Sequence, residues 1–203
     1  MANGRVITGY SKPYVAVYSV SDNTVSYASC QALARGVSVS IEPTTGNDNI
    51  FYADNVAAES AGGVFSGGTA TFVVDGLKDA ARKLIMGLPT ATSTTITTGT
   101  TVDVYTFDDS QSIPYVGVGF IVRYMEGGTT TYVPYVLTKT AFAMEGLEAS
   151  TQEDAIDFQT TELEATIMRD DSSTHAWLKF GAGQTTEAAA ENVVKKLLGA
   201  TIS

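Results

Sequence analysis

The sequence has little of what most catalytic and metal-binding sites are built from. Its 203 residues include one cysteine, Cys30, and one histidine, His175. A single cysteine excludes an internal disulfide and a cysteine zinc cluster. The sequence around the serines contains no strand–turn–helix nucleophile motif for the lone histidine to serve. We therefore interpret His175 as an ordinary residue at the end of a strand.

Charged residues are also scarce, at 17% of the chain, and they are unevenly distributed. The chain has 22 Asp and Glu but only 12 Lys and Arg, which gives a formal net charge of -10. A protein that wraps nucleic acid needs clustered cations, so this composition disfavours that role. The segments 36–77 and 140–168 contain many acids and no Lys or Arg. Solvated loops account for such segments, and so does a surface kept free of phosphate-binding cations.

No run of apolar residues is long enough to cross a bilayer, and the strongest, residues 116–122, is far too short. Residues 1–5 are not followed by the apolar stretch of a secretory signal. We therefore expect a soluble protein that is made in a cytoplasm and has no membrane partner. The 44% of hydrophobic residues is sufficient for one domain, 1–203, with a single core.

The remaining candidates for chemistry are acid pairs and glycine pairs, and neither has the spacing that a site requires. A glycosidase needs two carboxylates facing each other across a cleft, which adjacent acids do not provide. Asp170-Asp171 is most simply a solvated turn, and it lacks the spacing of a calcium loop. Gly62-Gly63 and Gly67-Gly68 are not followed by the Lys-Ser/Thr of a phosphate-binding loop. The sequence thus predicts no enzyme, no catalytic residue, no metal and no cofactor.

Most of the chain has the pattern of β-strands, so the expected class is mainly β (α+β). Alternation in residues 36–41 and 69–74 gives each strand one apolar and one polar face. Gly127-Gly128 between two apolar runs predicts a hairpin. The predicted strands are 13–18, 36–41, 69–74, 115–125, 131–137, 157–169 with a bulge near Thr160-Thr161, and 175–180. The apolar side chains expected in the core are Val37, Val39, Ile41, Ala70, Phe72, Val74, Leu163, Ala165 and Ile167.

Two amphipathic segments predict helices that pack on a sheet. The first covers about 77–86 and is stopped by Gly87 and Pro89. The second covers about 186–198, with an apolar stripe that includes Leu197, and Gly199 follows it. We expect long loops at about 43–68 and at 90–101, and an N-terminal arm at about 1–12.

The order of several segments resembles the major tail protein family of siphophages, the long-tailed bacteriophages, of Gram-positive bacteria. The resemblance covers nearly the whole chain, although no single motif is specific. Glu162 and the length of the Thr-rich segment 90–101 depart from the family pattern. The segments that carry it are 37–43, 51–55 with 58–60 (compare "YADN…AES"), 65–71, 114–120 (compare "PYVGFGY"), 156–160 with 165–169 (compare "IEFQTP…GTIMRD"), and the closing helix.

The resemblance implies a β-sandwich or barrel tail-tube fold with a helix packed on it. Six subunits would close a ring, and rings would stack into a virion tail tube through which DNA passes without specific binding. Implied partners are further copies of the chain and the tape-measure, tail-terminator and distal-tail proteins. If the strands at 36–42 and 69–74 line the channel, the residues expected to face it are Ser38, Ser40, Glu42, Thr69 and Thr71. The residues expected to contact the next ring are Phe51, Tyr52, Asp54, Glu59 and Phe65.

Other functions fit the same sequence less closely. A tube subunit of a contractile injection or secretion machine would follow the same ring logic. A phage head, decoration or receptor-binding β-sandwich would share the strand pattern without forming a tube. An enzyme is the least favoured alternative, because no catalytic constellation is recognisable.

Overall fold

The fold is that of a computed structural model, which describes residues 4–46, 49–53, 56–109, 111–146 and 159–202. For 49–53 and 56–61 only the backbone is described. The described chain is mainly β, as the sequence predicts. Its elements are β1 (Val6–Ser21), β2 (Thr24–Ala32), β3 (Gly36–Thr45), β4 (Asn49–Ala53), β5 (Val56–Ala61), β6 (Phe65–Val74), α1 (Asp79–Met86), β7 (Thr92–Thr97), β8 (Thr100–Val104), β9 (Val116–Glu126), β10 (Thr129–Phe142), β11 (Thr161–Met168), β12 (Leu178–Phe180) and α2 (Glu187–Leu197).

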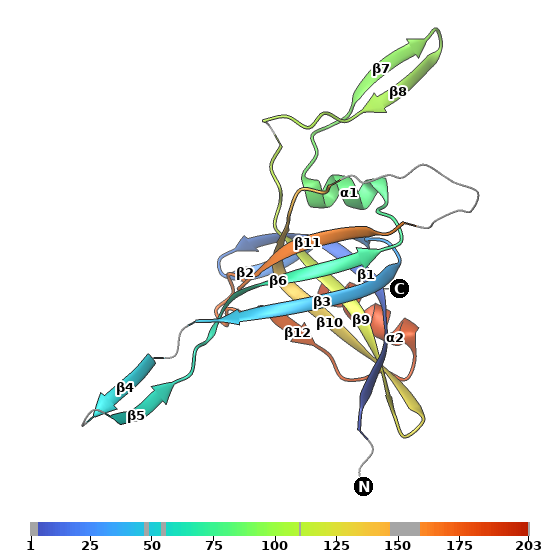
Figure 1. The fold of residues 1–203 in the computed structure, drawn as a ribbon. Coiled ribbons are helices and arrows are strands. Elements are labelled where there is room, and N and C mark those ends of the chain that lie inside the picture. The colour runs from blue at the N-terminus through green and yellow to red at the C-terminus, as the bar shows by residue number, and fades with distance from the viewer. Residues whose placement is uncertain (1–3, 47–48, 54–55, 110, 147–158, 203) are drawn as a thin grey trace.

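Eight of the strands form one antiparallel sheet in the order β2-β1-β9-β10-β11-β6-β3, with β12 paired to β10. The sheet folds over itself, so that β11, β6 and β3 cross in front of β1, β9 and β10 (Figure 1). One continuous sheet therefore supplies both layers of the sandwich. The two small sheets, β4–β5 and β7–β8, project away from this body (Figure 1).

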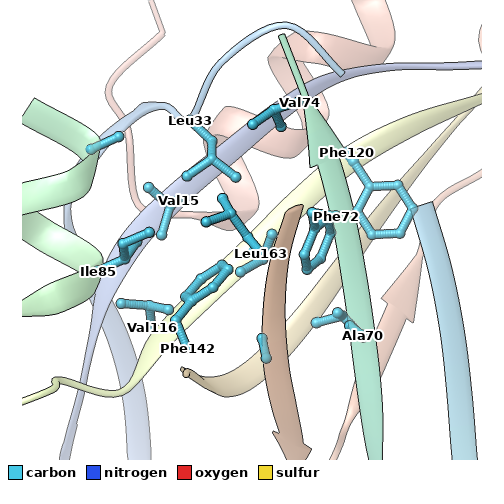
Figure 2. Packing of buried hydrophobic residues seen from close by; sticks show 14 of the residues in the cluster. Val15, Leu33, Ala70, Phe72, Val74, Ile85, Val116, Phe120, Phe142 and Leu163 are labelled. Carbon is cyan, nitrogen blue, oxygen red and sulfur yellow. The ribbon is translucent and has the colours of Figure 1, made fainter. Parts of the chain in front are cut away.

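The main core lies between the two layers and is closed at one end by α1. Phe72 of β6 is fully buried and meets the rings of Phe120 and Phe142 at centroid distances of 6.1 and 6.0 Å. Val15 of β1 and Ile85 of α1 are also fully buried in this cluster (Figure 2). The predicted core positions in β6 and β11 are confirmed as buried: Ala70, Phe72, Val74, Leu163, Ala165 and Ile167.

The helix α2 covers the outer face of β1, β9 and β10 and forms a second, smaller core there. Ala190, Val194 and Leu198 follow one another at helical spacing and are fully buried. Gly119 permits the close approach, because a Cβ at this position would lie 2.6 Å from Cγ1 of Val194. Leu197, which the predicted stripe includes, is instead 37% exposed because it lies beside the buried row.

A polar network fastens α2 to β1. The hydroxyl of Tyr14 donates to Oε1 of Glu191 at 2.6 Å, and Lys195 Nζ lies 2.7 Å from the same oxygen. Lys12 Nζ lies 3.4 Å from Glu191 Oε2. Burial raises the pKa of Glu191, but hydrogen bonds from Lys195 and Tyr14 outweigh it and lower the pKa to about 2. The carboxylate therefore stabilises the attachment of α2 in its charged form.

The hairpin at Gly127-Gly128 is confirmed. β9 and β10 pair on either side of it, with Glu126 opposite Thr129. Both glycines have positive φ, 54° and 83°, which a tight turn between these strands requires. The start of α1 at Asp79 is two residues later than predicted, and Gly87 ends the helix in the left-handed conformation as expected.

Three predicted irregular segments are instead strands. The expected N-terminal arm enters the main sheet at Val6, which pairs with Met125 of β9. The expected loop at 43–68 is the end of β3, the β4–β5 hairpin and the start of β6. The expected loop at 90–101 belongs to the β7–β8 hairpin, where Gly99 has a φ of 84° in the turn. Runs of threonine favour strands because the branched side chain fits a pleated surface, and this outweighs their polarity.

Two further details of the strand predictions differ from the structure or lie beyond it. Val37 was expected in the core but is 54% exposed, because a bulge between Gly36 and Ser38 shifts the pairing of β3 with β6. β11 begins at Thr161 and pairs with β6 in unbroken register as far as Ile167. Asp157 and Phe158, at the start of the predicted strand, lie outside the described residues.

Candidate functional site

Three neighbouring strands, β3, β6 and β11, present one face that neither helix covers. α2 packs on β1, β9 and β10, and α1 contacts β1 and β10. The apolar residues of the three strands point into the main core, so the alternate residues point outward. We name this outward surface the polar face. Its members are Ser38, Ser40 and Glu42 of β3, Thr69, Thr71 and Val73 of β6, and Glu162, Glu164 and Thr166 of β11.

Strand register arranges the polar face in three cross-strand rows. Thr71 lies opposite Ser40 on one side and opposite Glu164 on the other. Thr69 lies between Glu42 and Thr166, and Val73 completes the third row between Ser38 and Glu162. Directly opposed residues have Cβ atoms about 5 Å apart, so small hydroxyls and carboxylates form a continuous patch.

The polar face contains three carboxylates and no Lys or Arg. Glu42, Glu162 and Glu164 are all exposed, and none forms an ion pair with the described part of the chain. The cations at its border are engaged elsewhere. The guanidinium of Arg169 donates to the carbonyl oxygen of Phe65, and Lys139 Nζ lies 2.7 Å from Oδ2 of Asp171. The patch is therefore negative and offers no cation to a phosphate.

The polar face unites residues that are distant in sequence. The five residues predicted to face a channel, Ser38, Ser40, Glu42, Thr69 and Thr71, all belong to it. Sequence reasoning missed Glu162, Glu164 and Thr166. The signal was present, because these residues alternate with Leu163, Ala165 and Ile167. What the sequence did not give was the pairing of β11 with β6, which brings the two segments together.

The residues predicted to contact another ring are divided between the β4–β5 hairpin and the body. Phe51 lies on β4 and is paired in register with Glu59 of β5, and Tyr52 is also on β4. Asp54 lies outside the described residues. Phe65 is half-buried at the start of β6, and its ring stacks on Trp177 at a centroid distance of 4.4 Å. Phe65 thus contributes to the core of its own subunit.

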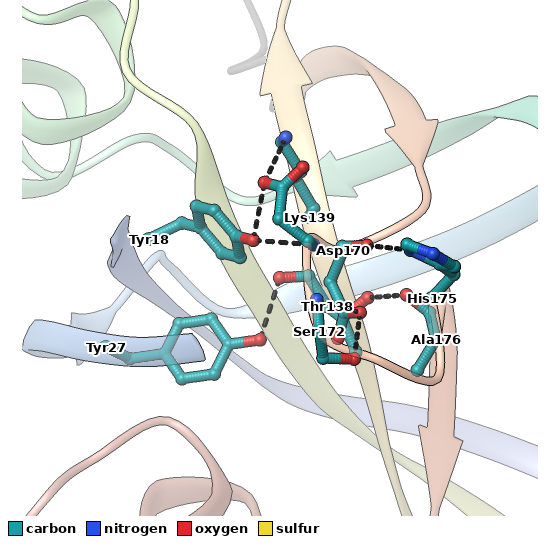
Figure 3. A network of polar contacts seen from close by, with 9 residues as sticks. Tyr18, Tyr27, Thr138, Lys139, Asp170, Ser172, His175 and Ala176 are labelled. Carbon is teal, nitrogen blue, oxygen red and sulfur yellow. Dashed lines mark hydrogen bonds and ion pairs between the residues drawn. The ribbon is translucent and has the colours of Figure 1, made fainter. Parts of the chain in front are cut away.

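The turn at Asp170-Asp171 was expected to be solvated, but it is built into the body (Figure 3). Asp170 is only 2% exposed, and its Oδ1 accepts hydrogen bonds from the backbone N–H of Ser172 at 3.2 Å and the hydroxyl of Ser172 at 2.6 Å. His175 has a φ of 49°, and its Nδ1 lies 3.2 Å from the carbonyl oxygen of Asp170. Polar burial of this kind fixes the turn that leads from β11 to β12.

Tyr18 connects the same turn to β1. Its hydroxyl donates to Oδ2 of Asp171 at 2.8 Å and accepts from the backbone N–H of Asp171 at 2.9 Å (Figure 3). Burial is the largest cause that raises the pKa of Tyr18 to about 12, and hydrogen bonds from Lys139 and Tyr18 lower the pKa of Asp171. Each group is held in its ordinary protonation state near neutral pH, which suits a structural link.

No family model matches the chain, and no curated protein matches it. Within the described ranges, no group of three or more His, Cys, Asp or Glu side chains could hold a metal ion. The same ranges contain no helix with the length and apolar character needed to cross a membrane.

Proposed function

We propose that this protein is the tail-tube subunit of a siphophage, a structural protein that acts by self-assembly. Six subunits close a ring, and stacked rings enclose the channel through which the genome leaves the virion. The polar face carries the proposal, because it suits the wall of a DNA channel. It is broad, hydroxyl-rich and negative, and it has no Lys or Arg.

The physical argument concerns friction between protein and DNA. Duplex DNA carries about one negative charge per 1.7 Å, and bound cations of a protein hold it by displacing counterions. A wall of serine, threonine and glutamate side chains instead leaves phosphates hydrated. Carboxylates at Glu42, Glu162 and Glu164 also repel the duplex over about one Debye length, about 8 Å at physiological salt.

The strand edges support assembly from several copies. β3 and β2 are the two ends of the strand order, and each has one hydrogen-bonded neighbour in the described sheet. Long open edges favour pairing with other strands. A closed ring satisfies such edges by heterologous contacts between identical subunits. In this proposal the tube is part of the virion, and its ends meet the tape-measure, tail-terminator and distal-tail proteins.

The experiment is sedimentation velocity of the purified protein over a wide concentration range, with deletion of residues 47–61 as the paired variant. We expect the full chain to pass from subunits to rings and then to long tubes as concentration rises. The deletion variant should fold and form rings but not elongate, since the β4–β5 hairpin extends from the body. A full chain that stays monomeric at every concentration would contradict the proposal, and normal tubes from the deletion would contradict the role of the hairpin.

A further inference from the structure

A surface pocket of about 770 Å³ lies at the end of the body where β3 begins and β6 has just ended. Its floor includes the buried residues Pro13 and Ala34. Lys12, Arg35 and Lys78 supply its cations, and Asp75 is the one acid that lines it. Three of the chain's 12 Lys and Arg therefore gather at one pocket of a protein with a net charge of -10.

The cations of this basic pocket are only partly neutralised. Arg35 Nε lies 3.8 Å from Asp75 Oδ2, but its side chain is 91% exposed, so the pair is weak. Lys12 pairs at 3.4 Å with Glu191, which lies outside the lining. Lys78 is exposed and has no ion pair with any described residue. The pocket is thus a positive site open to an acidic partner.

The β4–β5 hairpin has the complementary charge and lies at the opposite end of the same strands. It leaves the body after Thr45 and returns at Phe65, whereas Gly36 and Asp75 lie at the pocket. Ten residues of strand separate the two ends by about 30 Å. The sequence between Thr45 and Phe65 contains three acids and no Lys or Arg: Asp48, Asp54 and Glu59.

We propose that the acidic β4–β5 hairpin of one copy docks in the basic pocket of the next copy. This inference rests on the proposed tube and names the surface that receives its arm. A donor site and an acceptor site at opposite ends of one strand pair give a head-to-tail contact, which repeats without limit and sets the polarity of a stack. Two isolated strands are marginally stable in water, and docking against a second copy supplies the packing that they lack.

The test reverses the charge of the pocket and compares it with a matched control. Arg35→Glu with Lys78→Glu changes the net charge by the same amount as Lys179→Glu with Lys196→Glu, a pair of exposed cations that do not line the pocket. We expect the pocket variant to form rings but to need at least a tenfold higher concentration for tubes, measured by light scattering and sedimentation. The control variant should elongate like the natural protein.

Restoring the complementarity should restore elongation. Adding Asp54→Lys and Glu59→Lys to the pocket variant is expected to return tube formation to within about threefold of the natural protein, as paired charge reversal recovers attraction. A cross-linking arm mixes two proteins that lack Cys30, one with Lys78→Cys and one with Ser60→Cys. Oxidation should join them only as a disulfide between chains.

The outcomes separate the two proposals. Natural protein that forms tubes while the pocket variant elongates like the control would overturn the docking and leave the tube intact. Tubes without a cross-link between Lys78→Cys and Ser60→Cys chains would do the same. Natural protein that never leaves the monomeric state would overturn both.

Discussion

Two lysines placed on the polar face should convert a surface that DNA passes into one that DNA binds. Ser40 and Glu42 are exposed neighbours on the same face of β3, and no cation lies in their cross-strand rows. Ser40→Lys with Glu42→Lys cancels the three negative charges of the face in each subunit. In a hexameric ring this adds about twelve lysines around the channel. The fold should be unaffected, because both side chains point away from the core.

The magnitude follows from counterion release. Each lysine that engages a phosphate steepens the slope of log K against log salt by about 0.9. If about six lysines of a ring engage, lowering the salt from about 200 to about 50 mM tightens DNA binding about a thousandfold. We therefore expect intact tails of this variant to eject DNA slowly or not at all at low salt, with partial recovery at high salt.

The assay is the rate of DNA ejection from purified particles after a triggered receptor signal, measured at both salt concentrations. Glu126→Lys with Thr129→Lys is the control, since it makes the same charge change at the exposed β9–β10 turn, away from the polar face. Unchanged ejection by the Ser40 and Glu42 variant at low salt, in tails of normal length, would refute the assignment of this face to the channel. Equal slowing by the control would refute it as well.

Three further predictions concern the subunit itself. Phe72→Ala removes a fully buried ring and should lower the free energy of unfolding by about 3–5 kcal/mol in urea titrations. The folded pKa of Glu191, about 2, lies below the unfolded value of 4.5, so its contribution is present above about pH 4.5 and is lost as pH falls toward 2. Glu191→Gln should cost on the order of 2 kcal/mol at pH 7, less at pH 3, and an equal cost at both pH values would contradict this. Replacing 92–104 by a short Gly-Ser linker should change the unfolding free energy by less than about 1 kcal/mol, because every residue of β7 and β8 is exposed.

Local periodicity in the sequence predicted the strands, the helices and much of the core. Phe72 and Leu163 lie on apolar faces that a period of two identifies, and Ala190 and Val194 follow the helical period. Val37 obeys the same alternation yet is exposed, because the bulge at Gly36 depends on how β3 pairs with β6. A one-residue shift reverses the faces of a strand, and such shifts are tertiary features.

The candidate site was predicted in part for the same reason. Residues on β3 and β6 could be grouped by alternation alone, but Glu162 and Glu164 joined them only through the order of strands in the sheet. The basic pocket had no sequence signal, because Lys12, Arg35 and Lys78 belong to three separate connections. The burial of Asp170 likewise depends on its bonds to Ser172 and on the fold around it.

The most direct test of the proposed function is electron cryomicroscopy of the purified protein at high concentration. The account predicts stacked rings around an open channel, with Ser40, Glu42 and Glu164 on the channel wall and α2 on the outside. A tube whose channel is lined by α2, or a protein that forms no ring at any concentration, would contradict it.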